Sequence, residues 1–145
     1  MIKEKMTESM ITSVLGTKRS CKRFMSPDKR VKLARDRANA DQGEFFFAKA
    51  KMSNGDVIPR PVFIIGKNED SNDTEDVIVC SCTKSPARTL YDVEVQLKKK
   101  TSVRTNKIYT IHRDQMVFKI NHNLPDEVID SIIEKATQSV QKDPR

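Results

Sequence analysis

From Gly43 onward the sequence consists of short apolar runs separated by turn signals, and this pattern restricts the fold more than any other feature. The run Glu44–Ala50 is aromatic, Asn54-Gly55 is a turn signal, and Pro61–Ile65 is an apolar run that ends before Gly66. Runs of this length fit strands and are too short for helices. The pattern therefore predicts a mainly β protein built on a small, strongly curved sheet or barrel.

Three further segments extend this pattern toward the C-terminus. Val77–Thr83 is apolar along its length, and Val93, Val95 and Leu97 alternate with polar residues, as in a half-exposed strand. Two more short strands, Ser102–Arg104 and Lys107–Ile111, are expected on either side of a polar turn. A helix is expected after Leu124-Pro125, with an apolar face made of Val128, Ile129, Ile132, Ile133, Ala136 and Val140.

The segment before Gly43 is helical in character. Apolar residues recur at helical spacing between Ile2 and Leu15, and Ser26-Pro27-Asp28 is a helix start with an N-cap, a proline and an acidic residue in the right order. The second helix is expected to carry only a thin apolar stripe, made of Val31, Ala34 and Ala38. We therefore expect a helical extension over residues 1–42 and a barrel domain over residues 43–145.

The positive charge of the chain is concentrated in this extension. The 145 residues contain 27 Lys+Arg and 20 Asp+Glu, of which residues 1–42 contain 11 and 5, so they account for +6 of the net +7. Two interpretations remain open. The extension is either a solvated amphipathic segment packed loosely on the barrel, or an arm that binds nucleic acid or another partner.

Several classes of protein are disfavoured by composition. No apolar run reaches the ~20 residues of a membrane span, and the N-terminus lacks the apolar block of a signal peptide. Three cysteines give no disulfide framework, which favours a reducing cytoplasm. Cys80 and Cys82 are expected on one side of a strand as buried thiols, because His112 and His122 are too distant in sequence to complete a metal site.

The order of these segments resembles the MazF/PemK family of toxin endoribonucleases. Gly43-Glu44 opening an aromatic strand, and the run Arg60–Ile65, are similar to the first two strands of that family. Val77–Thr83 is similar to the next strand, and Val103–Ile111 resembles a late segment in which a strand passes through a polar turn into another strand. Asn123-Leu124-Pro125 before the last helix is also similar. The resemblance covers about residues 43–140.

This resemblance implies a fold and an activity. The expected fold is an SH3-like small barrel of the MazF/PemK/CcdB type, with a C-terminal helix and a helical N-terminal extension. The implied activity is metal-independent, sequence-specific cleavage of single-stranded RNA without a cofactor. The implied partners are the RNA, an antitoxin protein that blocks the enzyme, and a second copy of the chain in a homodimer.

The resemblance also assigns roles to residues. The RNA 2′-hydroxyl can attack the neighbouring phosphate, so the protein has to stabilise the charge that develops on phosphorus. Arg60 is the candidate for this task, because a guanidinium pairs bidentately with phosphate oxygens, and Thr83 is the candidate for orienting the phosphate. The remaining candidates for RNA contact are basic: Lys49, Lys51, Lys84, Arg88, Lys98, Lys99 and Arg104.

Alternatives remain open at these positions. Arg60 can equally be an ordinary residue at a strand entrance, and Thr83 a strand-end hydroxyl that caps its own backbone. Residues 1–42 have no counterpart in compact members of the family. The second hypothesis is therefore a non-catalytic protein on the same fold, which binds DNA, RNA or a host nucleic-acid enzyme through its basic arm.

Overall fold

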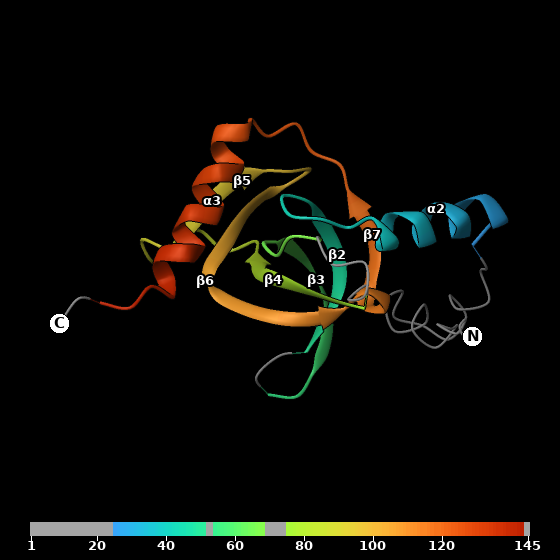
Figure 1. The fold of residues 1–145 in the computed structure, drawn as a ribbon, viewed down its shortest axis with the longest axis horizontal. Helices are drawn as coiled ribbons and strands as arrows, with labels where there is room; N and C mark the ends of the chain where they lie inside the picture. The colour runs from blue at the N-terminus through green and yellow to red at the C-terminus, as the bar shows by residue number, and fades with distance from the viewer. Residues whose placement is uncertain (1–24, 52–53, 69–74, 144–145) are drawn as a thin grey trace.

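The computed structural model describes residues 25–51, 54–68 and 75–143 (Figure 1). Its elements, in chain order, are helix α2 (Pro27–Ala38), strands β2 (Phe45–Lys51), β3 (Val57–Ile64), β4 (Asp76–Thr83), β5 (Asp92–Gln96) and β6 (Lys100–His112), the 3-10 turn η2 (Arg113–Gln115), strand β7 (Met116–Ile120) and helix α3 (Asp126–Ser139). The first expected helix, between Ile2 and Leu15, lies outside the described residues.

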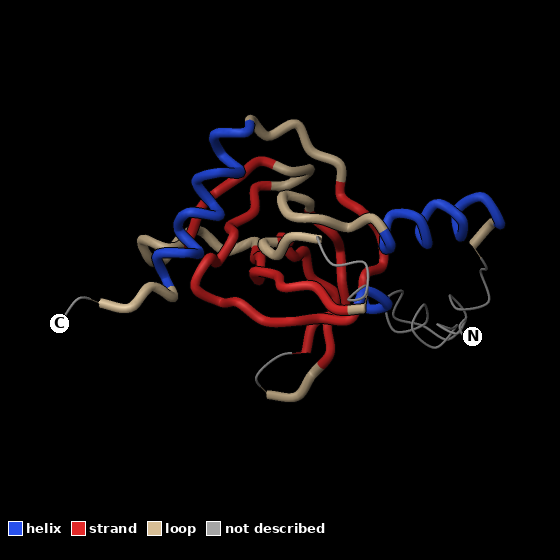
Figure 2. The backbone as a smooth tube through the Cα atoms, viewed as in Figure 1, coloured by secondary structure: helices blue, strands red, loops and turns tan. Residues whose placement is uncertain are grey.

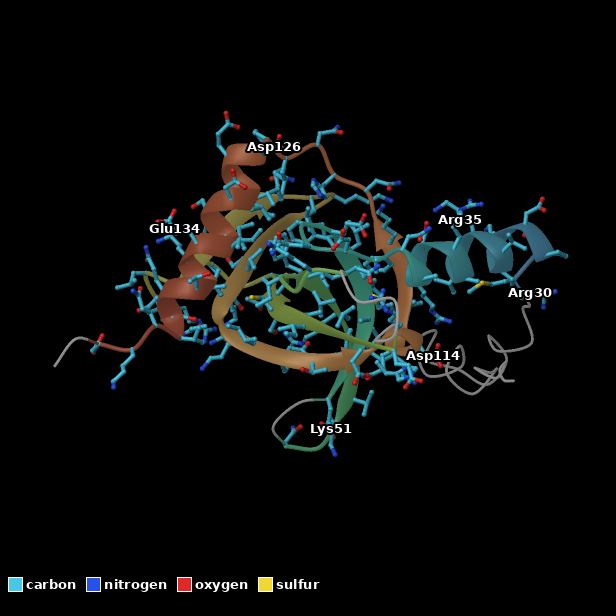
Figure 3. All side chains as sticks on the ribbon, viewed as in Figure 1. Arg30, Arg35, Lys51, Asp114, Asp126 and Glu134 are labelled. Atoms are coloured by element: carbon cyan, nitrogen blue, oxygen red, sulfur yellow. The ribbon has the colours of Figure 1, made fainter. Side chains whose placement is uncertain are left out.

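The six strands form one antiparallel sheet in the order β5-β6-β4-β3-β2-β7. The sheet curls into an open barrel, with α3 across one side and α2 at the opposite side (Figures 1 and 2). The mainly β fold with a C-terminal helix and a helix before the barrel is therefore confirmed. The β2–β3 hairpin projects from the barrel and carries Lys51 (Figure 3), and Gly55 adopts a φ of 94° in its turn.

One long strand replaces the two short strands expected around Thr105-Asn106. β6 runs without interruption from Lys100 to His112, and its first part pairs with both β5 and β4. The pairing with β4 shifts register between Cys80 and Ser81, because Cys80 lies opposite Ile108 whereas Ser81 lies opposite Arg104. The polar residues thus mark a β-bulge, which bends a strand without ending it.

Apolar side chains gather in two clusters, one on each face of the sheet. The first contains Phe46, Ala48, Val62, Ile64, Val77, Val79, Ile111 and Met116, together with Ala40 from the segment before β2. The second lies under α3 and contains Phe45, Phe63, Cys80, Cys82, Val95 and Val103, with Ile132 and Ala136 of the helix. Val140, expected on the apolar face of α3, is 70% exposed because the helix ends at Ser139.

Helix α2 begins where the sequence predicts, but the side of the helix that packs on the barrel is not the predicted apolar stripe. The Ser26 side chain accepts a hydrogen bond from the Lys29 backbone N–H at 3.2 Å, and Pro27 occupies the first turn. The expected stripe of Val31, Ala34 and Ala38 is exposed, with Val31 60% exposed, so that expectation was wrong. Leu33 is the buried residue of this helix.

Two arginines fasten the C-terminal end of α2 to the barrel. Arg37 donates from Nε to the Met116 carbonyl at 2.8 Å and from a terminal nitrogen to the Asp114 carbonyl at 3.1 Å. In return, the buried Arg113 donates to the Arg37 carbonyl at 2.6 Å and the Ala40 carbonyl at 3.1 Å. A cation at a helix C-terminus also interacts favourably with the helix dipole. We call these four hydrogen bonds the reciprocal arginine contact.

Within the described residues, no helix is long and apolar enough to cross a membrane.

We expect Arg113→Met to loosen α2 from the barrel. The substitution keeps an apolar side chain of similar length but removes two charge-assisted hydrogen bonds, for a loss of about 2 kcal/mol in the free energy of unfolding. An undocked 12-residue helix would also fray. Amide hydrogen exchange over residues 32–39, with a thermal melt, measures both effects. Arg35→Met, at an exposed position of the same helix, is the control; equal stability of the two variants would contradict the assigned role of Arg113.

Candidate functional site

Arg60 and Thr83 lie on two adjacent strands of the sheet, β3 and β4. β3 and β4 pair with Val62 opposite Ser81 and Phe63 opposite Cys80. Arg60 and Thr83 each lie two residues beyond the last of these pairs, Val62 and Ser81. Residues that face each other across antiparallel strands point to the same side of the sheet, so these two side chains share a face. The two residues that the resemblance singled out therefore lie on the same face of two adjacent strands.

Arg60 is half-buried and has unused hydrogen-bonding capacity. Its Nε is buried without a hydrogen-bond partner, and its guanidinium makes no hydrogen bond or ion pair with any other described residue. Burial raises the pKa of the nearby Tyr109 phenol to about 12, while the positive charge of Arg60 acts in the opposite direction. A guanidinium that is partly desolvated and lacks a carboxylate partner is well suited to an external anion.

Thr83 ends β4 and begins the connection to β5. Its Oγ1 accepts a hydrogen bond from the Ser85 backbone N–H at 3.2 Å, so the hydroxyl does cap its own backbone. A threonine hydroxyl has a second lone pair and a proton of its own, and this hydrogen bond leaves both available. The capping role and a contact with a ligand are therefore compatible.

Arg104 lies one pleat away from Thr83 on the same face. It is opposite Ser81 of β4 on one side and opposite Asp92 of β5 on the other. It is half-buried and, in the part of the chain that the structure describes, forms no ion pair. Ser81 is two residues from Thr83 and therefore points to the same side. This face of the sheet thus presents two guanidinium and two hydroxyl groups in adjacent rows.

The other basic candidates divide into two groups. Lys84 and Arg88 are exposed on the connection that follows Thr83, and Lys98 and Lys99 are exposed in the tight turn between β5 and β6. Lys49 and Lys51 are different. Ala48 is the residue of β2 that lies opposite Arg60, so the two lysines point to the other face of the sheet. Burial lowers the pKa of Lys49. Lys49 and Lys51 are not brought together with Arg60 by the fold.

Tyr109 and Ser81 were not assigned to the site from the sequence. Tyr109 lies opposite Val79, packs against the first apolar cluster and is close enough to Arg60 for the positive charge of Arg60 to act on the pKa of its phenol. The sequence signal for Ser81 was its two-residue spacing from Thr83. No comparable signal existed for Tyr109, because its place depends on the register after the bulge.

Cys80, Cys82 and the two histidines occupy structural positions. Cys80 and Cys82 are both buried in the second apolar cluster, as expected. His112 accepts a hydrogen bond from the Asp114 backbone N–H at 3.0 Å, and His122 packs edge-on against Phe45 with ring centroids 5.2 Å apart. No cluster of three or more metal-ligating side chains occurs in the described ranges.

We expect Cys80 and Cys82 to resist alkylation in the folded protein. Burial raises the pKa of both thiols, that of Cys80 to about 12, so the reactive thiolate is scarce at about pH 8. Iodoacetamide treatment followed by peptide mass spectrometry should show modification of these two residues only after denaturation. Rapid modification of either residue in the folded protein would contradict this.

The fold is shared with solved toxin structures. A mycobacterial endoribonuclease in complex with its cognate antitoxin aligns with a TM-score of 0.57 at 15% identity, over 69% of this chain and 93% of its own. MazF from Deinococcus radiodurans aligns with a TM-score of 0.56 at 13% identity, over 68% and 93%. The Mycobacterium tuberculosis toxin MazF-mt6 aligns with a TM-score of 0.51 at 18% identity, over 66% and 96%. No curated protein matches the sequence.

The sequence itself matches the model of one protein family. The match extends over residues 41–140, which include strands β2 to β7 and helix α3, and it excludes α2. The chain therefore belongs to the family of PemK-like, MazF-like toxins of type II toxin-antitoxin systems.

Proposed function

We propose that this chain is a toxin endoribonuclease that cleaves single-stranded RNA at specific sequences without a metal ion. The observation that supports this most directly is the pair Arg60 and Thr83. The β3–β4 register brings both side chains to one face, and the Arg60 guanidinium has no hydrogen-bond partner among the described residues. Structures that align with this fold include proteins described as endoribonucleases.

In the proposed reaction the RNA supplies its own nucleophile. The 2′-oxygen forms a bond to phosphorus as it loses its proton, and the bond from phosphorus to the 5′-oxygen breaks as that oxygen gains a proton. The products are a 2′,3′-cyclic phosphate and a 5′-hydroxyl. Arg60 would stabilise the additional negative charge on the phosphoryl oxygens, and its partial burial strengthens that interaction. Thr83 would donate its hydroxyl proton to a phosphate oxygen and so orient the phosphate.

The remaining partners follow from the family. We propose an antitoxin protein that blocks the site, a homodimer as the active form, and a cytoplasmic location. One aligned structure is an endoribonuclease bound to its cognate antitoxin, and another is a MazE–MazF assembly. The reducing cytoplasm agrees with the buried free thiols of Cys80 and Cys82.

The rival hypothesis places the function in the basic arm. The exposed cations of α2 include Lys29, Arg30 and Arg35, of which Arg30 and Arg35 are labelled in Figure 3. Lys32 is paired with Asp36 at 2.8 Å. α2 is not a free arm, however, because the reciprocal arginine contact fastens it and Ala40 lies in the core. Deletion of residues 1–42 would therefore damage the fold, so substitutions of surface charges give a cleaner test.

We expect Arg60→Ala and Thr83→Ala each to reduce RNA cleavage by about tenfold or more, because each removes an interaction with the phosphate in the transition state. The assay uses a mixed-sequence single-stranded RNA in excess EDTA. The wild-type protein should give discrete fragments that end in a cyclic phosphate.

The matched controls for this experiment are Lys49→Ala and Arg35→Ala, neither of which lies on the Arg60 face of the sheet. Circular dichroism confirms that each variant is folded. Intact RNA after incubation with folded wild-type protein at micromolar concentration would refute the proposed nuclease, and full activity of Arg60→Ala would refute its assigned site.

We expect the triple variant Lys29→Gln, Arg30→Gln, Arg35→Gln to keep the cleavage pattern of the wild type. Loss of three exposed charges should weaken RNA affinity modestly and reduce its salt dependence, since such charges act through counterion release. Affinity is measured by fluorescence anisotropy at two salt concentrations. If the triple variant abolished activity while Arg60→Ala did not, the basic arm would be the functional element.

A further inference from the structure

The connection between β4 and β5, residues 84–91, starts directly after Thr83 and is held by side chains along its length. Backbone N–H groups of five of its residues donate to side-chain oxygens: Ser85 to Thr83, Ala87 to Glu94, Arg88 and Thr89 to Asp92, and Tyr91 to Thr89. Three of its carbonyls accept from side chains of Ser102, Lys135 and Thr105. We call residues 84–91 the β4–β5 loop.

The two carboxylates of β5 contribute most to this order. Asp92 accepts from the Arg88 N–H at 2.8 Å and the Thr89 N–H at 3.3 Å through one oxygen. Glu94 accepts from the Ala87 N–H at 2.9 Å and pairs with Lys100 at 3.1 Å. The hydrogen bond from Ala87, followed by the interaction with Lys100, lowers the pKa of Glu94.

Such order has a consequence for binding. Fixing the backbone of one residue costs about 1–2 kcal/mol, so a flexible loop of this length loses much of its binding energy when a ligand orders it. In this loop the hydrogen bonds already order the backbone in the free protein, so a ligand does not have to order it. A loop that is ordered before a ligand arrives can contribute its contacts directly to affinity.

The side chains that the loop presents are suited to RNA. Lys84 and Arg88 are exposed and form no hydrogen bond or ion pair through their side chains within the described ranges, and Leu90 is 71% exposed. A guanidinium on an ordered backbone can pair with a phosphate or a base edge, and an exposed apolar side chain can pack on a base. Leucine at this exposure on an ordered backbone serves no packing role in the described structure.

We propose that the β4–β5 loop is a preorganised RNA-binding loop, in which Arg88 and Leu90 determine which nucleotide lies next to the scissile phosphate. Asp92 is a positioning residue that acts through the loop backbone. The proposal rests on the proposed function for its ligand, single-stranded RNA. In this proposal the loop forms a second wall of the RNA site. The loop begins directly after Thr83, which ends β4, and β4 lies beside the strand that carries Arg60.

The first test is kinetic and uses a short RNA that contains the sequence cleaved by the wild-type protein. Asp92→Ala and Arg88→Ala should each raise KM about tenfold while kcat changes less than about threefold, because both act on binding and neither touches the reacting atoms. The double variant should be no worse than the poorer single variant, because both substitutions disable the same contact. Asp130→Ala, at an exposed position of α3, is the control.

Two results would overturn the proposal. One is an unchanged KM in Asp92→Ala; the other is multiplication of the two single effects in the double variant, which would show that Asp92 acts elsewhere. Should Asp92→Ala fail to fold, Leu90→Ala and Arg88→Ala, both at exposed positions, carry the test. Sequencing of fragments from a mixed-sequence RNA should then show a relaxed nucleotide preference beside the cleavage site. An unchanged nucleotide preference in both variants would refute the proposed role of the loop.

Failure of the loop proposal can be distinguished from failure of the proposed nuclease activity. If the wild-type protein cleaves no RNA, the nuclease proposal fails, and the loop is tested by anisotropy of a labelled single-stranded oligoribonucleotide. Weaker binding of the oligoribonucleotide by Arg88→Ala than by the wild type would then support the proposed role of the loop. Equal binding by the two proteins, or no binding by either, would overturn it.

Discussion

The pairing of β6 with β4 and β5 is the interaction on which the rest of the structure depends. A single 13-residue strand pairs with both neighbours and carries the bulge opposite Cys80 and Ser81. A bulge increases the local twist and bends a strand, which lets a sheet of six strands curl into a barrel. The same register places Arg104 beside Ser81 and brings Tyr109 into range of Arg60. The register of β6 therefore shapes both the curvature of the sheet and the arrangement of the candidate site.

Partial burial determines what Arg60 can do. A fully solvated guanidinium interacts weakly with a phosphate, because water screens the charge and competes for the hydrogen bonds. A fully buried guanidinium would require a carboxylate partner, and that carboxylate would occupy the N–H groups that a phosphate needs. Arg60 lies between these limits, half-exposed and with its Nε already removed from water. The exposed cations Lys29, Arg30 and Arg35 of α2, and the lysines of the β5–β6 turn, remain solvated and contribute to the long-range field of the protein.

The strands from Phe45 to Gln96 could be predicted from alternation and turn signals, because each consists of a short apolar run between polar or glycine-containing breaks. The long strand β6 could not, since a bulge and a turn have the same polar signature at Thr105-Asn106. Met116–Ile120 lacks a turn signal before it, so no strand was predicted where β7 lies. For the site, residue chemistry and resemblance selected Arg60 and Thr83, whereas the place of Tyr109 required the three-dimensional register. Leu33, not Val31, turned toward the barrel because the reciprocal arginine contact sets the rotation of α2.

Helix α2 has one more effect, on the way in which copies of the chain can associate. β7 is the last strand on its side of the described sheet, and a strand in that position normally offers unpaired backbone groups to other chains. Arg37 already occupies the Met116 carbonyl, and α2 lies beside that strand. The opposite edge is β5, where Asp92 and Glu94 place negative charges along a short strand. One end of the sheet is therefore shielded by a helix and the other by charge, which protects a curved, β-rich protein against edge-to-edge aggregation.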